Sequence, residues 1–418
     1  MGWTSWNTFF EYNSEEKMIS QVDALLELGL DKFGYTFLTI DDRWQLPERD
    51  NATGRMVADP DRFPNGIRYL SDYIHTNGLK IGIYSSAGRF TCSGFLPGSL
   101  GHEKTDVEML LDWEIDYFKY DNCYPRLDGE TNVPGSGINI DFAASSAHYP
   151  SLWQEPPEQE RYAAMAREIA AVKDIRNITF ELCAWGFGNV ETFGPTFGHL
   201  WRTSMDVKDS WEQLLWNIDI NDEERYRSEG VQGPESGWNY PDGLFVGKGG
   251  MTDTEYRTMF ALWAIVKSPL MLGSDLRTIS RDSEAYKIIT NRGLIDINQD
   301  SLGVQARCVK DCCSHQSTGG LTSPYTCHLF SHSWQIWTGP LSSQAWVVLV
   351  LNRFDKEISF TMDWHSQALI PLGSYQLEDV WTGQVVANIT AGGHTWQGAE
   401  YRGILQPHEN LSFKLSPL

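Results

Sequence analysis

Apolar runs alternate with amphipathic stretches along roughly the first three hundred residues. Eight short apolar, β-branched or aromatic runs predict strands, at 1–7, 35–41, 79–85, 115–121, 178–185, 200–207, 237–243 and 269–273. Between them, segments with the apolar period of a helix lie at 14–29, 64–78, 105–114, 158–172, 209–220, 253–268 and 283–291. Strands that alternate with helices in this way predict an α/β fold, a (β/α)8 TIM barrel over residues 1–303.

The pattern changes after residue 304. Short alternating strands without a helical period are predicted at 325–341, 344–353, 357–364, 374–383 and 410–418. This part, residues 304–418, is therefore expected to form a C-terminal antiparallel β-sandwich. The segment 125–157 is a long irregular insertion after the fourth predicted strand, and loops of that length are usually functional or mobile.

Charge and composition narrow the kind of partner. The 418 residues include 55 acidic and 33 basic side chains, a formal charge of -22. Such a balance argues against nucleic acid or an anionic membrane as partner, and no window is apolar enough to span a bilayer. The first residues have neither the basic start nor the apolar stretch of a signal peptide. The chain has 17 Trp and 17 Tyr, which suits either a sugar-binding protein or simply a large core.

Cysteines and glycosylation sequons favour a secreted glycoprotein with disulfide bonds. Sequons stand at four positions, Asn51, Asn177, Asn388 and Asn410, and there are seven cysteines, so at least one thiol is unpaired or intermolecular. Four cysteines cluster in 308–327, where two disulfides are favoured over a zinc site because the spacing is not a repeated CxxC. The pairing among Cys308, Cys312, Cys313 and Cys327 is left open.

The stretch 117-YFKYDNCYP-125 places Lys119 and Asp121 at the end of a predicted strand. Positions two apart in a strand point to one face, so the two residues could form a structural ion pair. The alternative is that Asp121 is reactive and Lys119 binds substrate. Further charged residues end other strands of the predicted barrel, where TIM-barrel active sites lie. They are Asp41, Asp42, Arg202, Asp206 and Asp242. Stability alone would not gather so many like charges at one rim, which favours the reactive interpretation.

Three other kinds of chemistry fit the sequence poorly. A barrel metallohydrolase would need clustered histidines, and the closest pair, in 328-HLFSH-332, falls in the predicted sandwich. There is no GxSxG motif for a serine hydrolase and no glycine-rich phosphate loop. Glycoside hydrolysis remains, because two carboxylates can perform it alone.

Seven motifs, in order along the whole chain, resemble the landmarks of the α-galactosidase family, glycoside hydrolase family 27. They are 1-MGWTSWN, 38-LTIDDRW, 58-ADPDRFPNGI, 78-GLKIGIYSSAG, 118-FKYDNC, 201-WRTSMDVKDSW and 294-LIDINQDSLG. The insertion after Cys123 and the acidic composition resemble secreted fungal members.

The resemblance implies roles for individual residues. Asp121 matches the nucleophile and Asp206 the acid/base; from sequence alone Asp209 is an equal candidate, but the motif places it in the cap of the following helix. For sugar binding, the resemblance assigns Asp41 and Asp42 to O4 and O6, Lys119 to ring hydroxyls and Arg202 to O2. It places Trp6 against the apolar sugar face, Tyr84 in the pocket wall, and Cys183 and Trp185 near O2, and it keeps Asp242 in the pocket. Cys92 and Cys123 match a family disulfide, and no cofactor or metal is implied.

Three departures from the family pattern concern specificity. The family's WNDPDM is 238-WNYPDG here, so Gly243 replaces a Met that borders the sugar and Tyr240 replaces an Asp. Ala184 stands where relatives often carry Glu, Gln or Asn. Cys183 has no obvious disulfide partner and is the candidate for a free thiol.

The sequence therefore predicts a retaining exo-glycosidase that removes terminal α-D-galactosyl residues from oligosaccharides or polysaccharides. Alternatives with the same fold and mechanism are β-L-arabinopyranosides or α-N-acetylgalactosaminides as substrates. A different class of function would be a non-catalytic galactose-binding protein. Retention of both Asp121 and Asp206 argues against that class, since a lectin needs neither.

Overall fold

A computed structural model describes residues 1–125, 157–227, 232–312, 334–392 and 400–418. The chain divides into two compact units. The first comprises Met1–Asp206 with Met271–Thr278, and the second Val207–Leu270 with Ile279–Leu418. Most of the predicted insertion, the cysteines Cys313 and Cys327 and the segment 328–332 lie outside the described residues. The predicted domain boundary after residue 303 stays a prediction.

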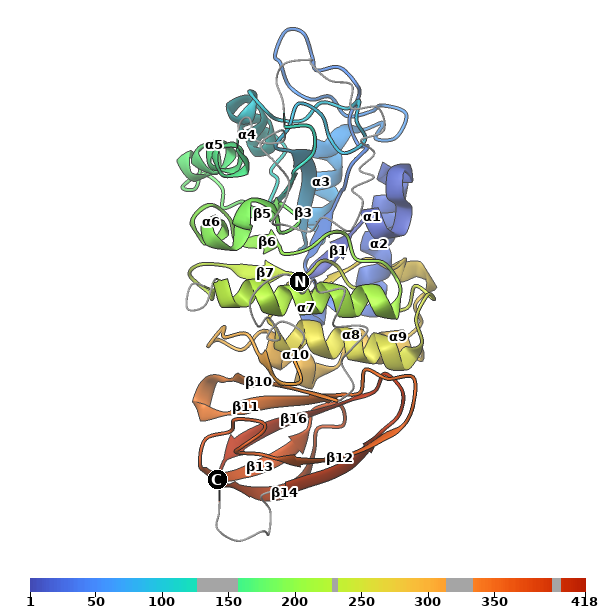
Figure 1. The fold of residues 1–418 in the computed structure, drawn as a ribbon. Helices are drawn as coiled ribbons and strands as arrows, with labels where there is room; N and C mark the ends of the chain where they lie inside the picture. Colours follow the sequence, from blue (N-terminus) through green and yellow to red (C-terminus); the bar gives the residue numbers. More distant parts are fainter. Residues whose placement is uncertain (126–156, 228–231, 313–333, 393–399) are drawn as a thin grey trace. The chain divides into compact units, whose positions relative to one another are not determined.

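Parallel strands form the centre of the first unit (Figure 1). Their order is β6-β5-β4-β3-β2-β1-β8, and each neighbouring pair runs parallel. The strands are β1 (Gly2–Thr4), β2 (Phe37–Thr39), β3 (Lys80–Ser86), β4 (Tyr117–Asp121), β5 (Thr179–Cys183), β6 (Leu200–Arg202) and β8 (Met271–Leu272). The helices between them are α1 (Trp6–Phe9), α2 (Glu15–Leu28), α3 (Gly66–Thr76), α4 (Glu103–Asp112), α5 (Glu158–Ala171) and α6 (Val190–Phe197). Apart from α1 and α6, which were not predicted, this alternation is the one that the hydrophobic pattern predicts.

The residues at each end of helix α2 explain where the helix begins and ends. The Ser14 side chain accepts a hydrogen bond from the Lys17 N–H, which satisfies one of the free donors of the first turn. Gly29 ends the helix in the left-handed conformation, with φ 73°, which costs glycine little. Met18, Val22 and Leu25 then form its buried face.

Helix α6 was not predicted, and its composition explains why. Its sequence VETFGPTF contains Gly194 and Pro195, which normally interrupt a helix. Gly194 is needed because a Cβ there would lie 2.6 Å from the Trp201 ring on β6. This helix therefore forms because it packs closely against the neighbouring strand β6. The local sequence alone does not show that contact.

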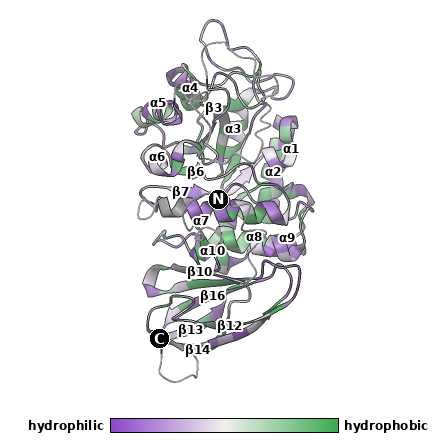
Figure 2. Ribbon diagram, viewed as in Figure 1, coloured by the Kyte–Doolittle hydropathy of each residue, from purple (hydrophilic) through white to green (hydrophobic). Residues whose placement is uncertain are grey.

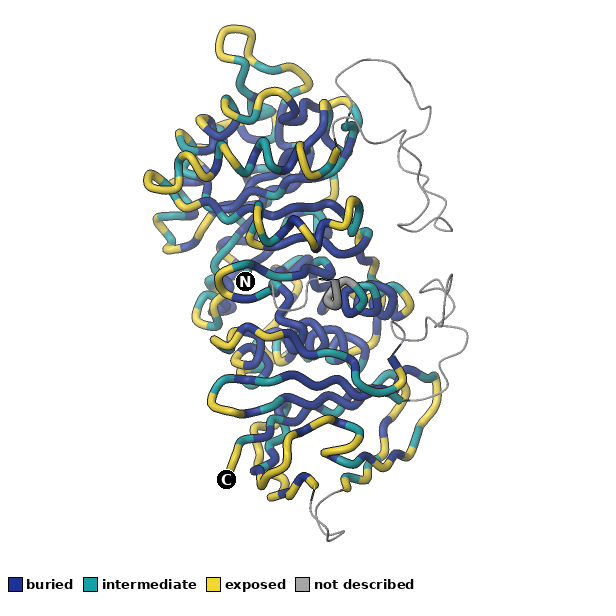
Figure 3. Tube along the Cα trace, turned by 60° about the vertical axis from the view of Figure 1, so that its left-hand side comes forward, coloured by how far each residue is buried: buried dark blue, intermediate teal, exposed yellow. Residues whose placement is uncertain are grey.

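The two faces of β4 carry different kinds of side chain: aromatic rings on one face and the charged candidate site residues on the other. Tyr120 meets Tyr162 of α5 with ring centroids 5.8 Å apart, and Phe118 stacks on Phe180 of β5 at 6.1 Å. These rings lie on the face that the helices cover. Lys119 and Asp121 alternate with them and so point to the opposite face. Figure 3 shows the long runs of buried residues in the strands.

The described part of the second unit includes four α-helices and a strand of the barrel series. They are α7 (Trp211–Arg227), β7 (Trp238–Tyr240), α8 (Asp253–Ile265), α9 (Glu284–Ile289) and α10 (Arg292–Asn298). Helix α8 begins with a capping box between Thr252 and Glu255. It is buried throughout its second half, and Figure 2 shows this helix largely green. A helix that is apolar on most sides is covered on most sides.

Antiparallel strands complete the second unit. A six-stranded sheet has the order β14-β13-β16-β11-β10-β9, and β12 pairs with β15. The strands are β9 (Arg307–Lys310), β10 (Gln335–Pro340), β11 (Trp346–Leu351), β12 (Ile358–Asp363), β13 (Gly373–Asp379), β14 (Gln384–Ala391), β15 (Glu400–Leu405) and β16 (Asn410–Pro417). Val348, Phe360, Trp364 and Phe413 lie in the core between the two sheets. Strands β9, β14 and β15 were not predicted; β14 is mostly exposed, which removes the alternating signal.

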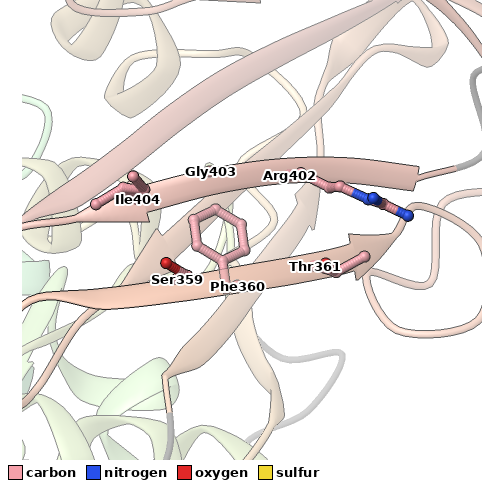
Figure 4. Close-up of a pocket in the computed structure, with 6 residues that line it drawn as sticks. All are labelled: Ser359, Phe360, Thr361, Arg402, Gly403 and Ile404. Atoms are coloured by element: carbon pink, nitrogen blue, oxygen red, sulfur yellow. The ribbon is translucent and has the colours of Figure 1, made fainter.

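Two further features describe the sandwich. Its outer face over β12 and β15 has a shallow hollow lined by Ser359, Phe360, Thr361, Arg402, Gly403 and Ile404 (Figure 4). Within the second unit, Arg353 forms a buried bidentate pair with Asp219 of α7 at 2.7 and 2.8 Å.

Among the described residues, no helix has the length and apolar character needed to cross a bilayer.

Candidate active site

Two consecutive carboxylates follow β2, and the protein holds both in place. Asp41 and Asp42 are each 2% exposed. The Asp41 N–H donates to Ser5 Oγ at 2.9 Å, and Asp41 Oδ1 accepts from the Asp42 N–H at 2.8 Å. Asp42 Oδ2 accepts from both the N–H and the hydroxyl of Ser93, at 3.0 and 2.8 Å. Burial raises the pKa of Asp42.

Lys119 is paired with a residue of another strand. Its ammonium lies 2.8 Å from Asp41 Oδ2 and 5.4 Å from the centre of the Tyr84 ring. Burial lowers the pKa of Lys119, but the Asp41 carboxylate and neighbouring acidic groups hold it well above its usual value. Lys119 therefore forms its ion pair with Asp41 of a different strand loop. The structural ion pair between Lys119 and Asp121 within β4, which the sequence allowed, is not the one formed.

Asp121 ends β4 and is 6% exposed. Its Oδ2 accepts a 2.9 Å hydrogen bond from the Tyr84 hydroxyl, and its Oδ1 accepts from the Asn122 N–H at 2.9 Å. Burial raises the pKa of Asp121 to about 7; the charge of Lys119 lowers it and the charge of Asp206 raises it. A carboxylate with both oxygens fixed by donors is well suited to act as a directed nucleophile.

A disulfide joins Cys92 to Cys123, as the family resemblance implies. Cys123 is two residues beyond Asp121, and Cys92 is next to Ser93, so the bond ties the loops after β3 and β4 together. A second disulfide joins Cys308 to Cys312. Among the described cysteines, Cys183 is the free thiol, as expected, and it is fully buried.

Arg202 connects the ends of β5 and β6. Its guanidinium donates to Cys183 Sγ at 3.5 Å and to Asp206 Oδ1 at 3.0 Å, and it is only 1% exposed. The side chain of Asp206, in contrast, is 62% exposed. Trp6 and Trp185 are both partly buried, and Trp185 has a positive φ of 57° at the turn after β5. The site therefore has a buried carboxylate at Asp121 and an exposed one at Asp206. Its two cations are the buried Arg202 and the partly buried Lys119.

Asp242 and Asp209 belong to the second unit and are both engaged there. Asp242 accepts hydrogen bonds from the N–H groups of Val207 at 2.9 Å and Gly243 at 2.7 Å. Asp209 accepts from the Tyr256 hydroxyl and from the Gly250 N–H. The predicted helix cap at Asp209 is off by one residue, because Ser210 Oγ receives the N–H of Gln213.

One group of described side chains has metal-ligand spacing: Cys92, Asp121 and Cys123. Both sulfur atoms belong to the disulfide, so they are not thiolate ligands. The donor set that remains is a single carboxylate, which does not fit a metal centre.

Several residues that support the site were missed from the sequence. Asn13 donates to the backbone carbonyls of Asp41 and Asp42, at 3.2 and 2.9 Å. Buried Arg161 donates to Asn122 Oδ1 at 2.5 Å. Together with Ser5 and Ser93, these side chains act by fixing others. Ser93 stands beside Cys92, and Ser5 lies within the motif 1-MGWTSWN. Asn13 and Arg161 come from distant segments that carry no motif.

The chain matches known family models over most of its length. Residues 1–143 and 158–300 match the model described as "Alpha galactosidase A", and residues 331–415 match "Alpha galactosidase C-terminal beta sandwich domain".

Individual relatives carry the same description. The chain is 36% identical to an α-galactosidase of Oryza sativa subsp. japonica, over 93% of this chain and 81% of the relative. It is 37% identical to α-galactosidase 2 of Arabidopsis thaliana, over 91% and 82%. The crystal structure of α-galactosidase I from Mortierella vinacea superposes with a TM-score of 0.78 at 29% identity, covering 99% of this chain and 96% of that one. This likeness confirms the predicted TIM barrel followed by an antiparallel β-sandwich.

Proposed function

Because the chain belongs to the α-galactosidase family of glycoside hydrolases, glycoside hydrolase family 27, we propose that it removes terminal α-linked galactose from oligosaccharides or polysaccharides. The reaction retains the configuration at C1 because it passes through two displacements. The observation that carries the proposal is the buried Asp121 carboxylate, which is fixed by hydrogen bonds from the Tyr84 hydroxyl and the Asn122 N–H.

Asp121 attacks C1 of the galactosyl unit while Asp206 protonates the departing oxygen. A covalent glycosyl ester forms on Asp121, and Asp206 then takes a proton from the water that cleaves it. The exposed carboxyl of Asp206 suits a group that must meet both leaving group and water.

The two steps need opposite protonation states of the two carboxyls. Negative charge on Asp121 favours the proton on Asp206, and conversion of Asp121 to an ester removes that charge, so Asp206 can ionise. Lys119 opposes the effect of burial on Asp121 and so helps to keep the nucleophile ionised. Arg202, bonded to Asp206 Oδ1, fixes the orientation of the acid.

The remaining predicted residues would bind the sugar. Asp41 and Asp42 hold O4 and O6, with Lys119 bridging ring hydroxyls. Arg202 reaches O2, where Cys183 and Trp185 limit the space. The other proposed contacts come from Trp6, Tyr84 and Asp242. Asp41 and Asp42 are both present to hold a hydroxymethyl arm, which favours galactose over arabinopyranose.

Initial rates on nitrophenyl α-galactoside, α-N-acetylgalactosaminide and β-L-arabinopyranoside test the substrate. The galactoside should be the preferred substrate. If either of the other two glycosides is hydrolysed faster, its sugar and not galactose is the substrate. If none of the three glycosides is hydrolysed, the galactose-binding protein without catalytic activity is favoured. Gly243→Met, which restores the residue of the family motif, should spare galactosidase activity if Gly243 admits another sugar.

We also propose that the protein is secreted. Two disulfides are formed, at Cys92–Cys123 and Cys308–Cys312, and disulfides persist in oxidising compartments. Three of the four sequon asparagines, Asn51, Asn177 and Asn388, are exposed.

A further inference from the structure

Arg161 of helix α5 is a buried cation to which the proposed mechanism gives no part. It is 2% exposed, and burial lowers its pKa. The Glu158 carboxylate lies 3.8 Å away, whereas the guanidinium makes closer hydrogen bonds to two uncharged oxygens. These are Asn122 Oδ1 at 2.5 Å and the Ala87 carbonyl at 3.1 Å. Burying a cation is costly, and bonds to uncharged oxygens recover less of that cost than a close carboxylate does. The arrangement therefore indicates a purpose beyond stability.

The two acceptors lie in the loops that follow neighbouring strands, and each also binds Asp121. Ala87 follows β3, and its N–H donates to the Asp121 carbonyl at 2.7 Å. Asn122 follows β4, and its N–H donates to Asp121 Oδ1 at 2.9 Å. Arg161 thus reaches from α5 to both residues whose N–H groups fix the backbone and the carboxylate of Asp121.

Other contacts fix the loops on either side of these residues and leave Asn122 to Arg161. The Ser86 hydroxyl donates to the Cys123 carbonyl and accepts from the Cys123 N–H, both at 3.1 Å. A Cβ on Gly88 would lie 1.7 Å from that same carbonyl oxygen, so the two loops touch there. These contacts hold Cys123, whereas the bond from Arg161 holds the side chain of the residue before it.

The Asn122 N–H influences the charge of Asp121 as well as its orientation. Burial raises the pKa of Asp121 to about 7, and the charges of Asp206 and Asp41 act in the same direction. Lys119 and the Asn122 N–H lower it. Further ionisable groups on the surrounding elements β3, α5, β5 and β6 include Tyr84, Tyr162, Cys183 and Arg202. Of the groups that favour the ionised carboxylate, the Asn122 N–H is the one that Arg161 holds.

We propose that Arg161 is a positioning residue for the attack of Asp121 on the sugar, which acts by holding Ala87 and Asn122 against the nucleophile. The inference rests on the proposed α-galactosidase activity. Arg161 touches no substrate. Its loss lets Asn122 move away from Oδ1, so the carboxylate gains freedom to rotate and its ionised form is less favoured.

Profiles of kcat/KM against pH on nitrophenyl α-galactoside test this role. Arg161→Gln and Asn122→Ala should each lower kcat/KM about tenfold, because each weakens a hydrogen bond to the ionised nucleophile. Both should also move the acid limb to higher pH, since Asp121 then ionises less readily. The double variant should lose less than about twofold beyond the more affected single variant, because both changes break the same link.

Two further variants separate positioning from charge and from stability. Arg161→Lys keeps the positive charge, but a single ammonium replaces the planar fork that reaches two acceptors, so it should behave like Arg161→Gln. Arg62→Gln is the matched control. Arg62 also donates to two backbone carbonyls, of Glu11 and Arg43, and has an acidic residue three positions before it, Asp59, at 3.4 Å. This variant should melt at a lower temperature and leave the acid limb where it is.

The outcomes distinguish this inference from the activity itself. A parent enzyme that does not hydrolyse the galactoside would refute the proposed function, and the inference with it. If the parent is active, the inference is wrong when Arg161→Gln loses rate with the acid limb unmoved, when Arg161→Lys keeps the parental profile, or when the two single effects add. Should Arg161→Gln fail to fold, the acid limb of Asn122→Ala decides, and an unmoved limb there overturns the inference.

Discussion

The Tyr84 hydroxyl donates a 2.9 Å hydrogen bond to Oδ2 of Asp121. The same phenol oxygen lies 3.4 Å from the N–H of Cys92, whose disulfide partner is Cys123. The proposed nucleophile is thereby tied, through one phenol, to the loop after β3. With the Asn122 N–H on the other oxygen, the carboxylate has little freedom to rotate.

Tyr84→Phe should weaken catalysis without changing the fold. A hydrogen bond to a charged group contributes about 1.5–3 kcal/mol, so kcat/KM should fall about tenfold or more. Because the phenol stabilises the ionised form of Asp121, its loss should also move the acid limb of the kcat/KM profile to higher pH. The measurement is kcat/KM against pH. A loss of rate without any shift of the acid limb would show that Tyr84 only shapes the pocket.

Asp121→Asn should alter stability in a pH-dependent way. Folding raises the pKa of Asp121 from 3.8 to about 7, so between these values the folded protein binds more protons than the unfolded chain. The stability of the wild type therefore falls as pH rises through this window. The asparagine variant lacks that loss, so its Tm relative to wild type should increase from pH 4 to pH 8. A constant Tm difference would contradict the raised pKa.

Asp206→Ala should lose activity on substrates with poor leaving groups and keep part of it on an activated nitrophenyl galactoside. Azide needs no general base, so it should speed turnover of the glycosyl ester about tenfold or more. The product should be α-galactosyl azide, with the configuration retained. A β-configured product would indicate that Asp206, and not Asp121, is the nucleophile.

Protein secreted from a eukaryotic host should carry a glycan on Asn388 and none on Asn410. Asn388 is exposed on β14, whereas Asn410 is buried, donating to the Thr258 hydroxyl at 3.0 Å. Its Oδ1 accepts from Ser412 at 2.8 Å, so a glycan there would break both bonds. Peptide mass spectrometry after enzymatic deglycosylation distinguishes the two sites. Modified Asn410 in folded enzyme would refute its burial.

The periodicity of the sequence predicted the alternating strands and helices because each depends on its own apolar face. Lys119 and Asp121 were placed on one face by the two-residue period of β4. The resemblance to the α-galactosidase family is confirmed, and with it the architecture. The predicted roles of the individual site residues stay predictions.

What the sequence did not show depends on contacts between distant segments. The partner of Lys119 is Asp41, 78 residues away. Nothing in the sequence around either residue indicates that the two form a pair. Asn13, shortly before α2, and Arg161, in the first turn of α5, support the site without belonging to a motif.

The most direct test of the account is to trap the covalent intermediate. A fluorinated galactosyl fluoride that forms the ester quickly and hydrolyses slowly should inactivate the enzyme with one sugar bound per chain. Proteolysis and mass spectrometry should then place that sugar on Asp121. A label on any other residue, or inactivation without a covalent adduct, would contradict the assignment of Asp121 as the nucleophile.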